Sequence, residues 1–190
     1  MALPDDKVVA ATVRWLERAV IGLNLCPFAK SVWVKNQVRI TVSTATTTDA
    51  LLDELIAELE LLAEAAPEKI DTTLLVHPHV LGDFYDFNDF LDVADVALAE
   101  LGLDGELQIA SFHPDFQFAD SDPDDIANAT NRSPYPTLHL LREASIDRAV
   151  AAFPDAAEIF ERNIDVLREL GAEGWEKLGV GPHDPDVSPK

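Results

Sequence analysis

The stretch NATNRSPYPTLHLLRE, which occupies positions 128–143, gathers side chains that can bind an anion and move a proton. An arginine can hold a carboxylate or phosphate through two parallel hydrogen bonds. Tyrosine and histidine can donate or accept a proton at a reacting group. Stiff proline backbone around such side chains lowers the entropy lost on binding. The candidate substrate-binding residues are Asn131, Arg132 and Arg142, and the candidate acid–base residues are Tyr135 and His139.

An internal role for the two arginines is the alternative to anion binding. The chain contains 35 acidic residues against 14 basic ones, so each arginine has many carboxylates to pair with. Asp115, Asp124 and Glu143 are examples of such partners. The sequence leaves both interpretations open, because spacing alone does not say which way an arginine points.

Histidine–proline pairs follow two segments that are expected to be strands. LLVHPH contains His77 and His79, and IASFHPD contains His113 and Asp115. In α/β folds, ligands bind beyond the carboxyl ends of the strands, so these side chains are candidates for a site at one sheet edge. Histidine is also a common transition-metal ligand, but no spacing here matches a known metal motif. We therefore predict no metal site and keep these four residues as weak candidates.

Cys26 is the only cysteine of the chain and lies in NLCPFAK. A catalytic thiol needs a lowered pKa, which a nearby histidine such as His113 can provide. The alternative is a small buried hydrophobe, since leucines and a phenylalanine surround this position. A single cysteine excludes an internal disulfide and is typical of a reducing compartment.

The net charge of −21 restricts the classes of partner. Nucleic-acid binding requires lysines and arginines that neutralise phosphates, and between Arg39 and Arg132 the only basic residue is Lys69. An anionic membrane surface would repel the protein, and no apolar run approaches the roughly 20 residues of a membrane span. MALPDDKVV is too polar for a signal peptide, so we expect a cytoplasmic protein without nucleic-acid or membrane partners.

Alternating helical and strand patterns predict an α/β domain. Apolar stripes favour helices over residues 5–23, 46–65 and 82–102, with Thr48 and Asp83 as the expected caps of the last two. Residues 38–43, 72–79 and 107–112 are typical of strands. This order indicates βαβ units, hence one domain over residues 1–178 with a small mixed or parallel sheet flanked by helices. Residues 179–190 are predicted to form a flexible tail.

Two segments of the second half are less regular. Residues 113–133 lack periodicity, and about twenty such residues inside a domain usually form a functional loop. For residues 134–143, Ser133 followed by Pro134 favours a helix start, whereas alternating Leu138 and Leu140 favour a strand. We favour the helix. Two further helices are expected after it, with Ser145 and Pro154 near their starts.

Four motifs connect the chain to a known family. LNLCPFAK, DFNDFLDVAD, ASFHPDFQFA and NATNRSPYPTLHLLREAS resemble a family of short bacterial proteins catalogued as a domain of unknown function. The resemblance covers about residues 9–151. It implies a bacterial, cytoplasmic, single-domain protein, and it assigns no catalytic role to any residue.

These observations lead to one principal hypothesis and two alternatives. The principal hypothesis is an enzyme for a small anionic metabolite that performs acyl or group transfer or hydrolysis, with His113 as acid–base and Cys26 as nucleophile. It requires His113, Arg132 and His139 to face the same side. The alternatives are a non-catalytic module that binds a ligand or a protein, and a metal-dependent hydrolase with histidine ligands. The sequence identifies no cofactor, and a homo-oligomer is compatible with an apolar face on the helix at 155–170.

Overall fold

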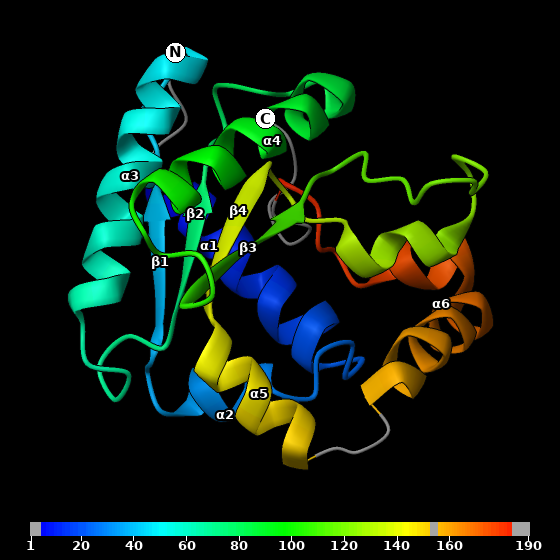
Figure 1. Cartoon of the computed structure of the whole chain (residues 1–190). Coiled ribbons are helices and arrows are strands. Elements are labelled where there is room, and N and C mark those ends of the chain that lie inside the picture. Colours follow the sequence, from blue (N-terminus) through cyan, green and yellow to red (C-terminus); the bar gives the residue numbers. More distant parts are fainter. Residues whose placement is uncertain (1–4, 153–155, 184–190) are drawn as a thin grey trace.

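The computed structural model describes residues 5–152 and 156–183 (Figure 1). Its centre is a four-stranded sheet in the order β1-β2-β4-β3. The strands are β1 (Val38–Val42), β2 (Thr72–Val76), β3 (Leu107–Phe112) and β4 (Thr137–Arg142). β1 is parallel to β2, and β4 lies antiparallel between β2 and β3. The predicted α/β class is therefore confirmed, in its mixed-sheet form.

The strand β4 corrects the helix predicted for residues 134–143. β4 forms ladders with strands on both sides, in which Leu138 lies opposite Leu75 of β2 and Ser111 of β3. The alternating Leu138 and Leu140 are fully buried on one face of the sheet. The local Ser–Pro signal for a helix start is thus outweighed by two rows of interstrand hydrogen bonds and by burial, which only the tertiary fold provides.

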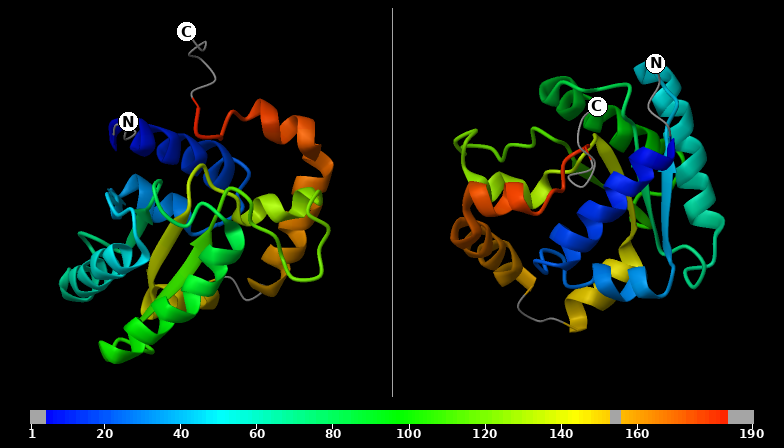
Figure 2. Two further views of the ribbon diagram at one scale, coloured as in Figure 1. Left: turned by 90° about the horizontal axis from the view of Figure 1, so that it is seen from above. Right: turned by 180° about the vertical axis from the view of Figure 1, so that it is seen from behind.

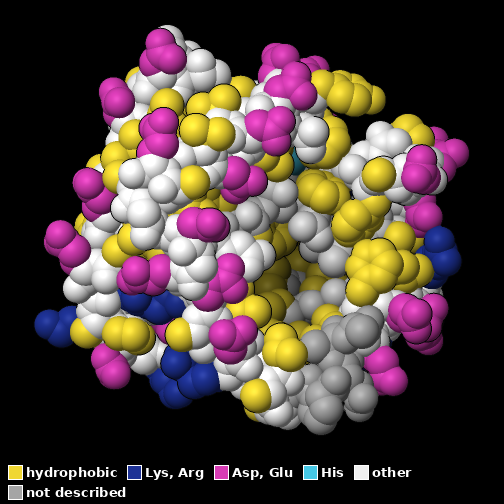
Figure 3. All heavy atoms as spheres, viewed as in Figure 1, with side chains coloured by type: hydrophobic (Ala, Val, Ile, Leu, Met, Phe, Trp, Pro, Cys, Tyr) yellow, Lys and Arg dark blue, Asp and Glu magenta, His cyan; other side chains and the backbone are white. Residues whose placement is uncertain are grey.

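Two helices cover one face of the sheet. α3 (Thr48–Glu64) and α4 (Phe84–Glu100) bury leucines and phenylalanines against Leu75, Leu138 and Leu140. Asp83 caps α4 as predicted, and the α3 cap is Thr47, one residue before the expected Thr48. Acidic side chains stand out on the solvent side of these two helices (Figure 3).

A different set of helices covers the opposite face, as Figure 2 shows. α1 (Asp5–Trp15) continues into η1 (Leu16–Ile21), a π-helical segment, and the two confirm the first predicted helix. Their apolar stripe packs on Leu74 and Val76 of β2. α2 (Ala29–Val34) and α5 (Glu143–Ala152) lie beside each other at one end of the sheet (Figures 1 and 2).

The C-terminal segment wraps back onto the domain. α6 (Ala156–Lys177) is kinked at Gly171, whose φ of 69° is left-handed, and it packs along η2 (Ile126–Asn131). Its Leu167 is fully buried, so part of the apolar face expected to be free for a partner packs internally. Pro154 lies outside the described residues.

The start of the predicted tail is held by the domain. Arg14 Nε donates to the Gly179 carbonyl at 2.8 Å, and Val180 is buried. Residues 184–190 of that tail lie outside the described residues.

Candidate functional site

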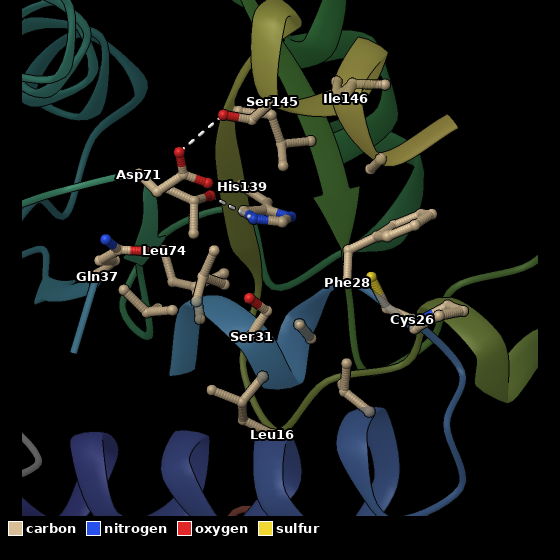
Figure 4. A pocket seen from close by; sticks show the side chains of 18 of the residues that line it. Leu16, Cys26, Phe28, Ser31, Gln37, Asp71, Leu74, His139, Ser145 and Ile146 are labelled. Carbon is tan, nitrogen blue, oxygen red and sulfur yellow. Dashed lines mark hydrogen bonds between the residues drawn. The ribbon is translucent and has the colours of Figure 1, made fainter. Parts of the chain in front are cut away.

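A cavity of about 580 Å³ lies between the sheet and the helices α1, α2 and α5 (Figure 4). Its walls are mainly apolar, because the α1 face of the sheet carries large aliphatic and aromatic side chains at this point. Those wall residues include Trp15, Leu16, Leu74, Phe112, Leu141 and Ile146. A volume of this size falls in the range of about 300–1,000 Å³ that is usual for small-molecule pockets.

His139 is the polar group in the middle of the cavity (Figure 4). It sits at the centre of β4, opposite Leu74 of β2 and Ala110 of β3. Its Nε2 lies 2.7 Å from Thr72 Oγ1, and its ring lies 5.9 Å from the Phe112 ring. Desolvation by these neighbours lowers the pKa of His139 to about 4, so the imidazole is neutral at neutral pH.

One end of the cavity is polar. Ser145 Oγ donates to Asp71 Oδ1 at 2.7 Å, and Arg148 Nη2 donates to Ser145 Oγ at 3.0 Å. Figure 4 shows Asp71, Ser145 and Gln37 on one side of His139. Lys35 and Arg148, which are both exposed, also line this cavity. A ligand there can meet hydroxyl, amide and cationic groups.

Cys26 lies towards the other end of the cavity, close to Phe28 (Figure 4). Burial raises the pKa of the Cys26 thiol, and backbone hydrogen bonds from Phe28 and Ala29 only partly oppose that rise. The thiol is therefore protonated at neutral pH and is a poor nucleophile. The structure agrees with the alternative of a small residue packed among hydrophobic neighbours.

His113 lies on the other face of the sheet, away from Cys26. It packs on the rings of Phe84 and Phe87 in α4, at centroid distances of 5.4 and 5.0 Å. Its Nε2 donates to the Leu81 carbonyl at 3.1 Å, and its Nδ1 accepts from the Asp115 N–H at 3.0 Å. Both ring nitrogens are thus engaged by the backbone, in a residue that is 0% exposed.

The two histidine-ended strands are parallel, but they are separated by β4. His77 and His113 nevertheless approach the same ring, because His77 stacks on Phe87 at 5.7 Å. Burial lowers the pKa of His77 to about 4. Among the described residues, no group of three or more His, Cys, Asp or Glu is placed to hold a metal ion, so His77, His79, His113 and Asp115 are not assembled into a metal site there.

Asn128 and Arg132 organise the loop at 113–133. Asn128 Oδ1 accepts from the Phe118 N–H at 3.0 Å and from Ser121 Oγ at 2.9 Å, and its Nδ2 donates to the Asp122 carbonyl. Arg132 donates to the carbonyls of Phe116 and Pro123. The predicted anion-binding arginine is thus occupied by main-chain oxygens of its own loop.

The remaining predicted site residues also contact main-chain oxygens. Asn131 Nδ2 donates to the Ser111 carbonyl at 3.1 Å, and the buried Tyr135 donates to the Pro182 carbonyl at 3.4 Å. Arg142 Nη2 contacts the carbonyls of Leu62 and Ala65 at the end of α3, both at 2.7 Å, and that of Ile70 before β2 at 2.9 Å. Of the predicted catalytic and substrate-binding residues, Cys26 and His139 line the cavity.

The geometry required by the principal hypothesis is therefore not met. His139 faces the α1 side of the sheet, His113 faces α4, and Arg132 is bound to its loop. The residues that complete the cavity were not predicted, notably Asp71, Thr72 and Ser145. No local motif marks them, since Asp71 and Ser145 are 74 positions apart and meet only through the β2–β4 pairing.

Comparisons with known proteins identify one family. A family model described as "Protein of unknown function (DUF1415)" matches residues 7–177. No curated protein and no solved structure matches the chain. Across residues 5–152 and 156–183, none of the helices has both the length and the apolar character needed to cross a bilayer.

Proposed function

The chain belongs to the DUF1415 family, and we propose that it is a small-molecule-binding protein whose ligand occupies the cavity around His139. The observation that carries this proposal is a cavity of about 580 Å³ with apolar walls and a few polar groups. Small-molecule sites typically combine a large apolar surface, which supplies affinity, with a few polar groups that fix orientation.

The distribution of side chains indicates an amphipathic ligand. Trp15, Leu74 and Phe112 offer apolar surface to a ring or short chain. Lys35 and Arg148 line the same cavity, and both are cations in a chain whose net charge is −21. The ligand class that these groups favour is an apolar body with a carboxylate or phosphate head. The proposal thus keeps an anionic ligand but assigns its head group to Lys35 and Arg148 in place of Arg132 and Arg142.

Binding without covalent catalysis is the function that the protonation states favour. The pKa of the Cys26 thiol is raised and that of His139 is lowered, so both groups are neutral at neutral pH. A thiol–imidazole pair that reacts readily shows the opposite pattern for the thiol, namely a depressed pKa. The cavity thus supports retention of a small molecule better than attack on it.

Fluorescence titration with 1-anilinonaphthalene-8-sulfonate tests whether the cavity binds such a molecule. This probe has two apolar aromatic groups, a naphthalene and a phenyl ring, and one anionic head. Ala149 lines the cavity, whereas the neighbouring Val150 is 45% exposed, so Ala149→Trp fills the cavity and Val150→Trp is its matched control. We expect saturable binding that weakens at least about 10-fold in Ala149→Trp and stays unchanged in Val150→Trp. Equal affinity in both variants, with both folded by circular dichroism, would contradict the proposal.

The head group is tested with the neutral counterpart of the same probe, N-phenyl-1-naphthylamine, which lacks the sulfonate. Replacing Lys35 and Arg148 together by glutamine should lower the affinity for the sulfonate probe by about 3- to 10-fold and leave the affinity for the neutral probe unchanged. Lys69→Gln is the control, because Lys69 is exposed and is not part of the cavity wall. An equal loss for both probes would show that the two cations do not recognise the anion.

A further inference from the structure

We infer that His139 presents an unprotonated Nδ1 to the cavity and so selects a ligand that carries a hydrogen-bond donor at this position. The inference rests on the proposed function, because it specifies the chemistry of the molecule that occupies the same cavity. Its basis is a short chain of hydrogen bonds that runs from the ring of His139 through Thr72 to the backbone of β4.

Thr72 determines which ring nitrogen of His139 carries the proton. Thr72 Oγ1 lies 2.7 Å from the Leu140 carbonyl oxygen and 2.7 Å from His139 Nε2. A carbonyl oxygen can only accept, and a hydroxyl has a single proton, so Thr72 donates that proton to Leu140. The lone pair of Thr72 Oγ1 then accepts from His139 Nε2–H. The hydrogen-bond network thereby assigns the Nε2–H tautomer.

The surrounding sheet holds this arrangement in place. Thr72 is 6% exposed and lies on β2 opposite Leu141, while His139 is opposite Leu74. Both partners therefore sit on adjacent paired strands whose register fixes their separation. Because the tautomer is set by a buried hydroxyl and a main-chain carbonyl, it does not depend on which ligand is present.

His139 Nδ1 is the nitrogen left for the ligand. Within the described part of the chain, no side chain or backbone group forms a hydrogen bond with this nitrogen. The unpaired polar side-chain atoms that are buried there are Thr73 Oγ1, His77 Nε2 and Arg142 Nε, so the unpaired His139 Nδ1 is not one of them. His139 Nδ1 is therefore accessible to solvent or to a ligand. Figure 4 shows the ring in the cavity, between the polar side of Asp71 and Ser145 and the apolar side of Phe28.

This geometry defines the ligand more narrowly. At neutral pH the unprotonated Nδ1 only accepts, so a hydroxyl or N–H of the ligand is favoured and an ether, carbonyl or carboxylate oxygen is disfavoured. A ligand that covers Nδ1 without donating to it leaves that nitrogen unpaired and cut off from water, so the site discriminates against an analogue that lacks the matching donor. The ligand class is an amphipathic molecule with a hydroxyl or N–H between its apolar body and its polar head.

Three naphthalenes that differ at one position test this selection. 2-Naphthol donates, 2-methoxynaphthalene only accepts, and naphthalene does neither; each competes with N-phenyl-1-naphthylamine at pH 7. We expect wild-type protein to bind 2-naphthol at least about 10-fold more tightly than 2-methoxynaphthalene. His139→Phe should remove the preference and still bind naphthalene. Thr72→Val should reduce the preference to within about 3-fold, because the ring can then adopt either tautomer.

The outcomes separate this inference from the proposed function. If all three compounds bind the wild type equally well, the donor selection is wrong and the cavity still binds small molecules. If no compound and neither fluorescent probe binds, the proposed function is wrong. The tautomer is measured without any ligand by long-range ¹H–¹⁵N correlation of the labelled protein, with His139→Phe assigning the ring. A pyridine-like Nδ1 and a pyrrole-like Nε2 are expected, and the reverse assignment would overturn the inference.

Discussion

Arg142, the last residue of β4, donates from Nη2 to the carbonyl oxygen of Leu62 in the final turn of α3, at 2.7 Å. The same nitrogen contacts the carbonyl of Ala65, the C-cap of α3, and that of Ile70, so one guanidinium binds both the end of α3 and the segment that leads to β2. The last carbonyls of a helix have no intrahelical donors and carry partial negative charge. The arginine that was predicted to bind a ligand thus serves as a helix cap.

Replacing Arg142 should therefore affect stability. Arg142→Met leaves buried carbonyls without donors, and we expect the free energy of unfolding to fall by about 2–4 kcal/mol in urea titrations. Arg168→Met is the control, because its ion pair with Asp125 lies at the surface with the arginine side chain 59% exposed, and it should cost less than about 1 kcal/mol. Equal stability of the two variants would show that the cap contributes little.

Two histidines with lowered pKa values, His77 and His139, should make the fold sensitive to mild acid. The pKa values of His77 and His139 are lowered to about 4 in the folded chain, against an ordinary value of 6.5. Between pH 6.5 and 4 the unfolded chain binds protons at these residues and the folded chain does not. Stability is therefore fully present above pH 6.5 and falls as the pH drops towards 4.

Urea unfolding at pH 7, 6 and 5 measures this dependence. Each of these two histidines contributes up to about 1.4 kcal/mol per pH unit to the slope of unfolding free energy against pH, below its unfolded pKa. His139→Phe should reduce this slope by up to about 1.4 kcal/mol per pH unit, since phenylalanine does not titrate. The same slope in the variant and the wild type would mean that His139 is protonated to the same extent in the folded and unfolded chains.

Cys26 should react slowly in the native protein. Because burial raises the pKa of its thiol, the thiolate that attacks alkylating reagents is scarce at pH 7.5. We expect iodoacetamide to modify the native chain at least about 10-fold more slowly than the urea-unfolded chain, as followed by intact mass. Cys26→Ser removes the only cysteine and should show no modification. A native rate equal to the unfolded rate would instead indicate an activated thiol.

Asn128 should be essential for the loop at 113–133. It is fully buried, and its amide makes three hydrogen bonds to Phe118, Ser121 and Asp122. Asn128→Ala removes the partner of the Phe118 N–H and of the Asp122 carbonyl and leaves a small cavity, and we expect a loss of about 2–4 kcal/mol in unfolding free energy. Asn88→Ala is the matched control, because Asn88 is exposed on α4 and its replacement should change stability by less than about 0.5 kcal/mol. Hydrogen exchange should also accelerate at Phe118 in the Asn128 variant alone.

Much of the fold follows from local patterns in the sequence. The apolar stripe through Leu52, Leu55 and Leu59 predicts α3, although the structure buries Leu51 fully and Leu52 only partly, and Asp83 marks the start of α4. Helix periodicity and capping are predictable because they depend on neighbouring residues. The helix predicted for residues 134–143 is wrong, since the conformation of this segment is decided by two partner strands that are distant in sequence. The predicted βαβ order also does not reveal that β4 lies between β2 and β3.

For the candidate site, the amino-acid sequence specifies which side chains are available, and its motifs point to Cys26 and His139, which both line the cavity. The neighbours of these side chains depend on the three-dimensional fold. It placed His139 beside Thr72 in a cavity, turned His113 towards α4, and bound Arg132 and Arg142 to main-chain carbonyls. The physical reason is that side-chain direction alternates along a strand, so the register of β4 with β2 decides which groups meet on which face of the sheet.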